Sequence, residues 1–159
     1  MRKKEKKVVV GGTFEELHKG HRRLLKKAFS LGKVFIGLTS DKMARSMRDR
    51  RVKDFKFRKK QLREFVKKEF GGKAKILKIE DKFGFTLKRD FDYIVVSSET
   101  YKTAILINKE RQKRNKKPIK IIKINLVLAE DKKPISSTRI IKGEIDKEGR
   151  LLKRSTNKK

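Results

Sequence analysis

The chain contains no cysteine and no tryptophan, and its 159 residues include two histidines and two prolines. Without cysteine there can be no disulfide bond and no thiolate metal site. No apolar run approaches the length that crosses a membrane, and the basic start leads into Val8–Val10, too short a segment for a secretory signal. These absences favour a cytoplasmic protein that has no membrane partner.

Acidic residues are scarce: 19 Asp and Glu stand against 49 Lys and Arg, a formal charge of +30. Such a balance attracts polyanions. The basic residues are spread over nearly every predicted helix, however, and do not form one stripe interleaved with aromatic rings, which a platform for stacked bases requires. We therefore expect weak, non-specific nucleic-acid binding at low salt, and a different main function.

Short β-branched runs alternate with helical patterns along the whole chain. We predict strands over 8–10, 34–38, 76–79, 93–96 and 119–128. The predicted helices are one that ends at Gly32, one closed by Gly71-Gly72, one capped by Ser98 and a short last one capped by Ser136 or Ser137. This alternation predicts one Rossmann-like, doubly wound α/β domain over 1–152, with about five parallel strands and helices on both faces. A basic, disordered tail is expected over 153–159.

In a doubly wound sheet the ligand lies beyond the carboxyl ends of the strands. The first segment after a strand runs from Gly11 to His21 and reads GGTFEELHKGH. Its two leading glycines allow a tight turn and a close approach of backbone to ligand. A helix is expected to begin near His18 or Lys19, so that its free amide groups face the ligand.

The histidines His18 and His21 stand three apart, on one face of the first helical turn. Gly20 between them is expected to leave room for a nucleoside. Imidazole N–H groups can stabilise charge that develops on a departing phosphate. Ordinary surface histidines and a half-formed metal site are the alternatives. Stabilisation of a phosphate is favoured over both alternatives, because the only two histidines of the chain coincide with the glycines and the helix start. Both side chains are expected to line an open crevice, so replacing them should cost little stability.

The string T-F-x-x-L-H-x-G-H at 13–21 resembles that of the nucleotidyltransferases with the HxGH signature. Their second signature is similar to Ile135–Arg139, which reads ISSTR. The resemblance covers nearly the whole chain and is closest to the archaeal type of phosphopantetheine adenylyltransferase. The strings that carry this narrower likeness lie at 37–41, 95–102, 108–118 and 143–149.

The resemblance implies that Thr13 sits between the ATP α-phosphate and the acceptor phosphate, and that His18 and His21 stabilise the transition state. It implies that Ser136, Ser137 and Thr138 hold the β- and γ-phosphates, which agrees with hydroxyls and amides at a helix start forming an anion site. Plain helix capping is the alternative for these three. The implied ATP-binding set is Gly11, Gly12, Thr13, Phe14, His18, Gly20, His21, Ser136, Ser137, Thr138 and Arg139, the last being either a phosphate clamp or a solvent-facing side chain.

The acceptor site is less defined. Bacterial members of the family place a lysine after the second strand, where this chain offers Lys42 or one of Arg45, Arg48 and Arg50; a solvated basic face is the alternative. After the fourth strand bacterial members use arginines, whereas this chain has Ser98–Lys102. Tyr101 and Lys102 are the acceptor candidates there, and Asp81 is one after the third strand. Phe83 and Gly84 could touch the pantetheine arm, or Phe83 could belong to the core.

The activity that the resemblance implies is transfer of the adenylyl group of ATP to 4′-phosphopantetheine, which yields dephospho-coenzyme A and pyrophosphate. Mg²⁺ is expected to accompany ATP by bridging phosphate oxygens, because the sequence shows no dedicated carboxylate cage. Two alternatives remain open: another HxGH transferase, which forms a cytidylyl product or FAD, and a basic nucleic-acid-binding protein.

Overall fold

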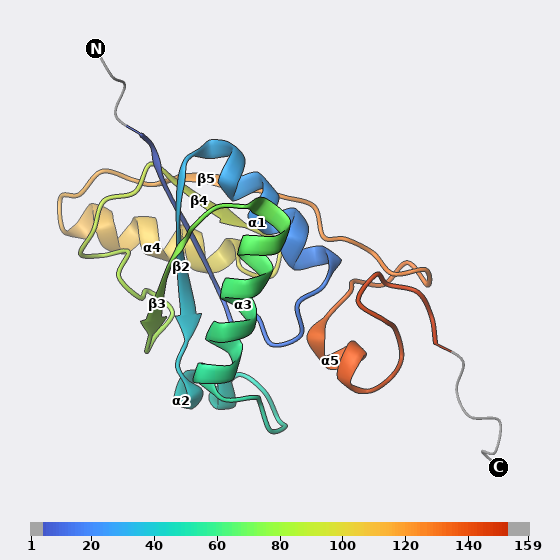
Figure 1. Cartoon of the computed structure of the whole chain (residues 1–159). Coiled ribbons are helices and arrows are strands. Elements are labelled where there is room, and N and C mark those ends of the chain that lie inside the picture. Colours follow the sequence, from blue (N-terminus) through green and yellow to red (C-terminus); the bar gives the residue numbers. More distant parts are fainter. Residues whose placement is uncertain (1–4, 153–159) are drawn as a thin grey trace.

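Five short runs of mostly β-branched residues form one parallel sheet in the computed structural model, which describes residues 5–152 (Figure 1). The strands are β1 (Lys7–Gly12), β2 (Lys33–Thr39), β3 (Lys75–Ile79), β4 (Tyr93–Val96) and β5 (Lys120–Lys123). Their order is β3-β2-β1-β4-β5, and every neighbouring pair is parallel. The strand order reverses between β1 and β4. This confirms the predicted doubly wound fold and places the ligand position at the carboxyl end of β1.

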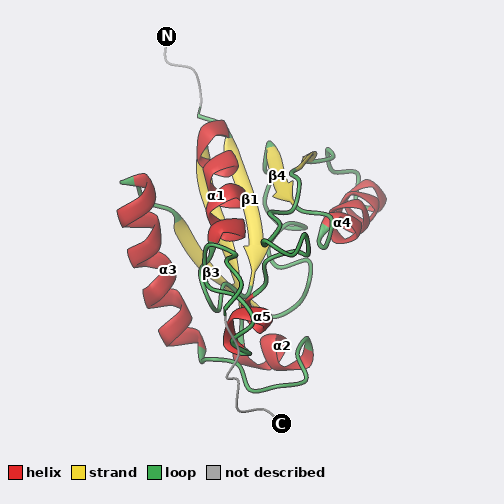
Figure 2. Cartoon of the chain, turned by 90° about the vertical axis from the view of Figure 1, so that its right-hand side faces the viewer, coloured by secondary structure: helices red, strands yellow, loops and turns green. Residues whose placement is uncertain are grey.

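Helices cover both faces of the sheet (Figure 2). α1 (Lys19–Leu31) and α3 (Phe55–Phe70) pack on one face, and α4 (Tyr101–Lys113) packs on the other. Two short helices, α2 (Asp41–Ser46) and α5 (Ser137–Ile141), lie near the end of the sheet toward which β1 runs. Among the described residues, no helix combines the length and the apolar character that crossing a bilayer needs.

Side chains of β1 alternate between two cores, as a strand buried on both faces requires. Val8 and Val10 join the core under α1 and α3, whereas Val9 joins the core under α4. A third, small core of Ala129, Ile135 and Ile145 holds the segment after β5 together. That segment carries the second signature and reaches the site from outside the sheet.

Two predicted boundaries are wrong. The fifth strand ends at Lys123 and not at Leu128. The amide of Ile124 still donates to the Val96 carbonyl at 2.8 Å, but β4 ends there, so the chain beyond has no strand to pair with. The N-cap of α4 is Thr100 and not Ser98, and Thr100 makes no side-chain capping bond. The predicted tail over 153–159 lies outside the described residues.

Candidate active site

The turn after β1 is shaped by one aromatic ring. Phe14 adopts a positive φ of 47° and folds its side chain back into the protein, where it is 2% exposed. A Cβ at Gly12 would lie 2.9 Å from this ring. The ring centroid of Phe14 lies 5.0 Å from that of His21. The second glycine is therefore required by Phe14, which in turn supports a histidine of the signature.

The two histidines cap the helix that carries them. His18 is the N-cap of α1, and its Nδ1 accepts from the Gly20 amide at 3.0 Å. The Nδ1 of His21 accepts from the His18 amide at 3.2 Å, which completes a capping box. The rings stack with centroids 3.8 Å apart. Because each Nδ1 accepts, a neutral ring carries its proton on Nε2. These capping bonds give both side chains a structural part, so that replacing them should cost more stability than an open crevice alone predicts.

The start of α1 is also less open than the sequence suggested. The amide of Lys19 donates to the Lys147 carbonyl at 3.0 Å, and the next amide is taken by His18. The space above Gly20 is filled as well, because an added Cβ would lie 2.8 Å from Cε1 of His18. The protein itself therefore satisfies the first two amides of α1, and Gly20 makes room for the His18 imidazole, while the expected room for a nucleoside stays a prediction.

Both imidazoles are held neutral. Burial lowers the pKa of His18 from its usual value to about 4. The pKa of His21 is held well below its usual range, first by burial and then by the adjacent His18, while the Glu16 backbone acts in the opposite direction. Near neutral pH both rings thus present Nε2–H donors without carrying a charge.

The second signature uses its three hydroxyls differently. Ser136 caps α5 by accepting from the Arg139 amide at 3.2 Å. The buried Ser137 hydroxyl accepts from the Glu16 amide at 3.1 Å and donates to the Glu16 carbonyl at 3.2 Å. The Thr138 hydroxyl accepts from Nη2 of Arg50 at 3.0 Å. Ser137 therefore joins the two signatures, whereas the protons of the Ser136 and Thr138 hydroxyls meet no acceptor within residues 5–152.

The two signatures line one cavity of about 480 Å³, called the polar cavity because its walls are richer in polar atoms than those of the second cavity. Predicted residues among its walls are Gly11, Gly12, Thr13, Phe14, His18, Gly20, His21, Ser136, Ser137 and Thr138. A second, mainly apolar cavity of about 140 Å³ lies beside it, over the α4 face of the sheet. Gly11, Gly12, Met47 and Thr100 line both, so the two cavities meet at the end of β1.

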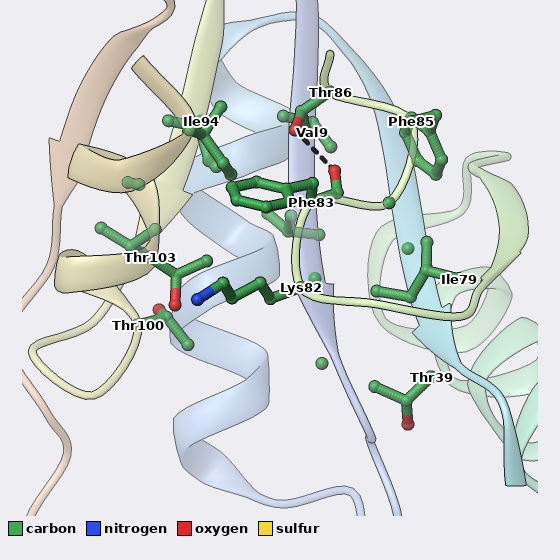
Figure 3. A pocket seen from close by; sticks show the side chains of 18 of the residues that line it. Val9, Thr39, Ile79, Lys82, Phe83, Phe85, Thr86, Ile94, Thr100 and Thr103 are labelled. Carbon is green, nitrogen blue, oxygen red and sulfur yellow. Dashed lines mark hydrogen bonds between the residues drawn. The ribbon is translucent and has the colours of Figure 1, made fainter. Parts of the chain in front are cut away.

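The apolar cavity is roofed by the loop after β3 (Figure 3). Phe83 extends over the space between this loop and Ile94 of β4. The amine of Lys82 points toward Thr100 and Thr103 at the start of α4. The arrangement offers an apolar slot with one cation near its rim.

Known proteins are similar to this chain over most of its length. A family model described as cytidylyltransferase-like matches residues 9–143. A phosphopantetheine adenylyltransferase of Methanosarcina mazei is 49% identical over 152 residues, which is 92% of this chain and 97% of that protein. The enzyme of the same name from Archaeoglobus fulgidus is 47% identical, covering 92% of this chain and 99% of that one. The chain belongs to the archaeal phosphopantetheine adenylyltransferase family.

A solved structure has the same fold as this adenylyltransferase family member. The crystal structure of a protein with unknown function from Archaeoglobus fulgidus superposes with a TM-score of 0.71 at 42% identity. The match covers 74% of this chain and 88% of that one.

Four predicted acceptor residues line neither cavity, whereas Thr13, which is predicted to contact both phosphates, lines the polar one. Lys42, Tyr101 and Lys102 are exposed and line neither cavity, and Asp81 accepts from the amides of Phe83 and Gly84, both at 2.9 Å. Their neighbours Lys82, Phe83 and Thr100 line the apolar cavity instead. The roles assigned to the four residues stay predictions.

The arginines near the site are bound in different ways. Arg139 lies outside the polar cavity and pairs with Asp131 and, at 2.8 Å, with Glu144. Arg50 pairs with Glu15 at 2.8 Å. Arg48 lines the polar cavity, and its buried Nε has no hydrogen-bond partner among the described residues. Of the four basic residues weighed after the second strand, Arg48 is therefore the one best placed to meet an anion.

Sequence reasoning missed one feature of the site. Arg58 is fully buried on α3 and donates to the Thr13 carbonyl at 3.1 Å. A signal existed, because Arg58 stands at the spacing of four that places Leu62 and Val66 on the buried stripe of α3. A charged residue on an apolar stripe points to buried hydrogen-bond acceptors.

Proposed function

We propose that this chain transfers the adenylyl group of ATP to 4′-phosphopantetheine, giving dephospho-coenzyme A and pyrophosphate. One observation carries the proposal: both signatures line a polar cavity that shares its floor with an apolar one. The polar cavity suits a triphosphate, and the apolar slot suits the pantetheine arm. The two would meet at Thr13, where the phosphates react.

An oxygen of the acceptor phosphate attacks the α-phosphorus of ATP. The new O–P bond forms as the bond to the bridging oxygen breaks, and pyrophosphate leaves with that electron pair. The attacking oxygen is already an anion, so the protein supplies no nucleophile. Its contribution is to position two anions and to stabilise the charge that grows on the leaving group.

The neutral His18 and His21 suit this task. Their Nε2–H groups donate to phosphate oxygens without attracting the ground-state triphosphate as strongly as a cation would. A donor bond strengthens as negative charge accumulates on the pyrophosphate, so the histidines favour the transition state over bound ATP. Thr138 and Ser136 are proposed to hold the terminal phosphates with their free hydroxyl protons.

Mg²⁺ is proposed as the companion of ATP. Among residues 5–152 no group of three or more histidine, aspartate or glutamate side chains is gathered as a metal site. The ion would therefore be held by the phosphate oxygens, and its chemistry would be to neutralise part of their charge.

The decisive experiment measures pyrophosphate release from ATP with 4′-phosphopantetheine, with pantetheine and with no acceptor. We expect turnover with the phosphorylated acceptor alone, because pantetheine lacks the attacking oxygen. CTP in place of ATP, and flavin mononucleotide in place of phosphopantetheine, test the two other transferase activities. Equal rates with either would overturn the assignment of substrates.

A further inference from the structure

The guanidinium of Arg58 donates in four directions. Its Nε bonds the Lys53 carbonyl at 2.7 Å, and its Nη2 bonds Asp41 at 3.2 Å. Its Nη1 bonds the Thr13 carbonyl at 3.1 Å and the Thr39 hydroxyl at 3.3 Å. Arginine has no acceptor, so every one of these bonds runs outward from Arg58. The cation thus sets the direction of the network around it.

Thr39 stands at the carboxyl end of β2 and is 1% exposed. Its Oγ1 accepts from Arg58, and it lies 3.0 Å from Oγ1 of Thr13. Within the described part of the chain, Thr13 Oγ1 is the one acceptor that the proton of the Thr39 hydroxyl meets. The opposite direction would leave this buried proton without a partner, which costs about 1–3 kcal/mol. The proton of Thr39 therefore points to Thr13.

Thr13 is then an acceptor toward Thr39, and its own proton has no acceptor among the described residues. The residue lines the polar cavity, whereas Thr39 lines the apolar one. This chain of hydrogen bonds from Arg58 through Thr39 to Thr13, here called the relay, ends where the two cavities meet.

We propose that Arg58 and Thr39 are positioning residues that orient the Thr13 hydroxyl so that it donates a hydrogen bond to the phosphate of the transferred adenylyl group. This inference rests on the proposed function, because it takes Thr13 to touch that phosphate. A free threonine hydroxyl rotates and can either donate or accept. The bond from Thr39 fills one lone pair of Thr13 before substrate binds and leaves its proton to donate, which is the preorganisation that an electrostatic site needs.

The test begins with Thr39→Val, which keeps the shape of the side chain and removes its hydroxyl. We expect kcat to fall roughly tenfold to a hundredfold, the cost of one hydrogen bond linked to a charged group, while KM for ATP changes little. Thr39→Ser should restore most of kcat. Thr39→Ala provides a second hydroxyl-free variant if the valine protein does not fold.

A double-mutant cycle then separates the relay from a structural role. If Thr39 acts through Thr13, adding Thr39→Val to Thr13→Val should lower kcat no further. Asn108→Ala is the structural control: it removes a side chain that bonds both the amide and the carbonyl of Ile119, at 2.8 and 2.9 Å, and lines neither cavity. It should lower Tm and leave kcat unchanged.

Normal kcat in a folded Thr39→Val protein, beside an active wild type, would overturn the relay and leave the proposed function intact. An equal loss from Thr39→Val in both Thr13 backgrounds would overturn it as well. A wild type that releases no pyrophosphate with 4′-phosphopantetheine would instead overturn the proposed function, and the relay with it.

Discussion

At the scale of the residue, the histidines of the first signature have two tasks that a substitution can separate. His21 is proposed to donate to the leaving pyrophosphate, and its Nδ1 also accepts from the His18 amide. His21→Ala should lower kcat by roughly two to three orders of magnitude, the usual cost of losing a preorganised donor. It should also cost about 1 kcal/mol of stability through the lost capping bond.

The matched variant is His21→Gln, since glutamine at the third helical position also completes a capping box. We expect a Tm near that of the wild type and a kcat as low as that of His21→Ala. Steady-state kinetics beside thermal melting checks both. A normal kcat in the folded glutamine protein would remove His21 from the chemistry.

The depressed pKa of His18 gives stability a predictable pH dependence. The unfolded chain takes up a proton near its usual pKa of about 6.5, whereas the folded chain resists protonation down to about 4. The unfolded state therefore binds more protons in this interval, so stability falls as pH drops from about 6.5 toward 4. His18→Asn keeps an N-cap residue and cannot titrate. Its Tm should decline less than that of the wild type between pH 7 and 5, and identical declines would contradict the assignment.

At the scale of the element, a buried arginine joins α4 to the loop that roofs the apolar cavity. Arg111 is 1% exposed and donates to the carbonyls of Lys117 and Thr86, both at 2.7 Å, and of Arg89 at 3.0 Å. Its Nη2 also bonds the exposed Asp90 at 2.7 Å. Because Thr86 belongs to the lining of that cavity, Arg111 fixes the position of the proposed acceptor slot.

Arg111→Met should therefore destabilise the fold by about 2 kcal/mol or more, since carbonyls at the site lose their buried donor. We expect KM for 4′-phosphopantetheine to rise more than KM for ATP, whose proposed site lies in the other cavity. Varying each substrate in turn, with the other at saturation, measures the two KM values. An equal rise in both constants would contradict the link between this loop and the acceptor.

The elements that sequence could predict are those defined by local pattern. The runs Val34–Leu38 and Tyr93–Val96 are apolar enough to specify buried strands, and the histidine string lies at the candidate site. What could not be predicted depends on contacts between distant segments. Arg58 can be buried because the carbonyls of Thr13 and Lys53 accept its hydrogen bonds. The first two amides of α1 donate to the Lys147 carbonyl and to the His18 ring. No local pattern records such partners.

The end of the fifth strand shows the same limit. Apolar residues recur from Ile119 to Leu128, so the sequence favours one long strand. β5 ends where its neighbour β4 ends, so the length of β5 depends on the pairing of the two strands and not on its own sequence alone. The residues released, such as Asn125 and Val127, become part of the polar cavity wall.

At the scale of the whole molecule, the charge of +30 remains the property least tied to the site. We predict that nucleic-acid binding is weak, independent of sequence and mostly lost at about 150 mM salt, because it rests on phosphate neutralisation alone. Titration of a labelled DNA duplex over a series of salt concentrations measures the slope. Nanomolar, sequence-selective binding at that salt concentration would favour the nucleic-acid-binding alternative.

The strand order also determines when the catalytic centre comes into being. On one side of β1 the strands β2 and β3 follow in chain order. Its neighbour on the other side, β4, lies far along the chain, and the amide of Lys7 bonds Asp92 across 85 residues. Contacts between distant segments form late, because closing a long loop costs entropy before the contact returns any stabilisation. Gly11 and Gly12 can become the floor of both cavities only after β4 and α4 have docked. On refolding, the capacity to bind nucleotide should therefore appear in the slowest phase, after most of the helical signal has returned.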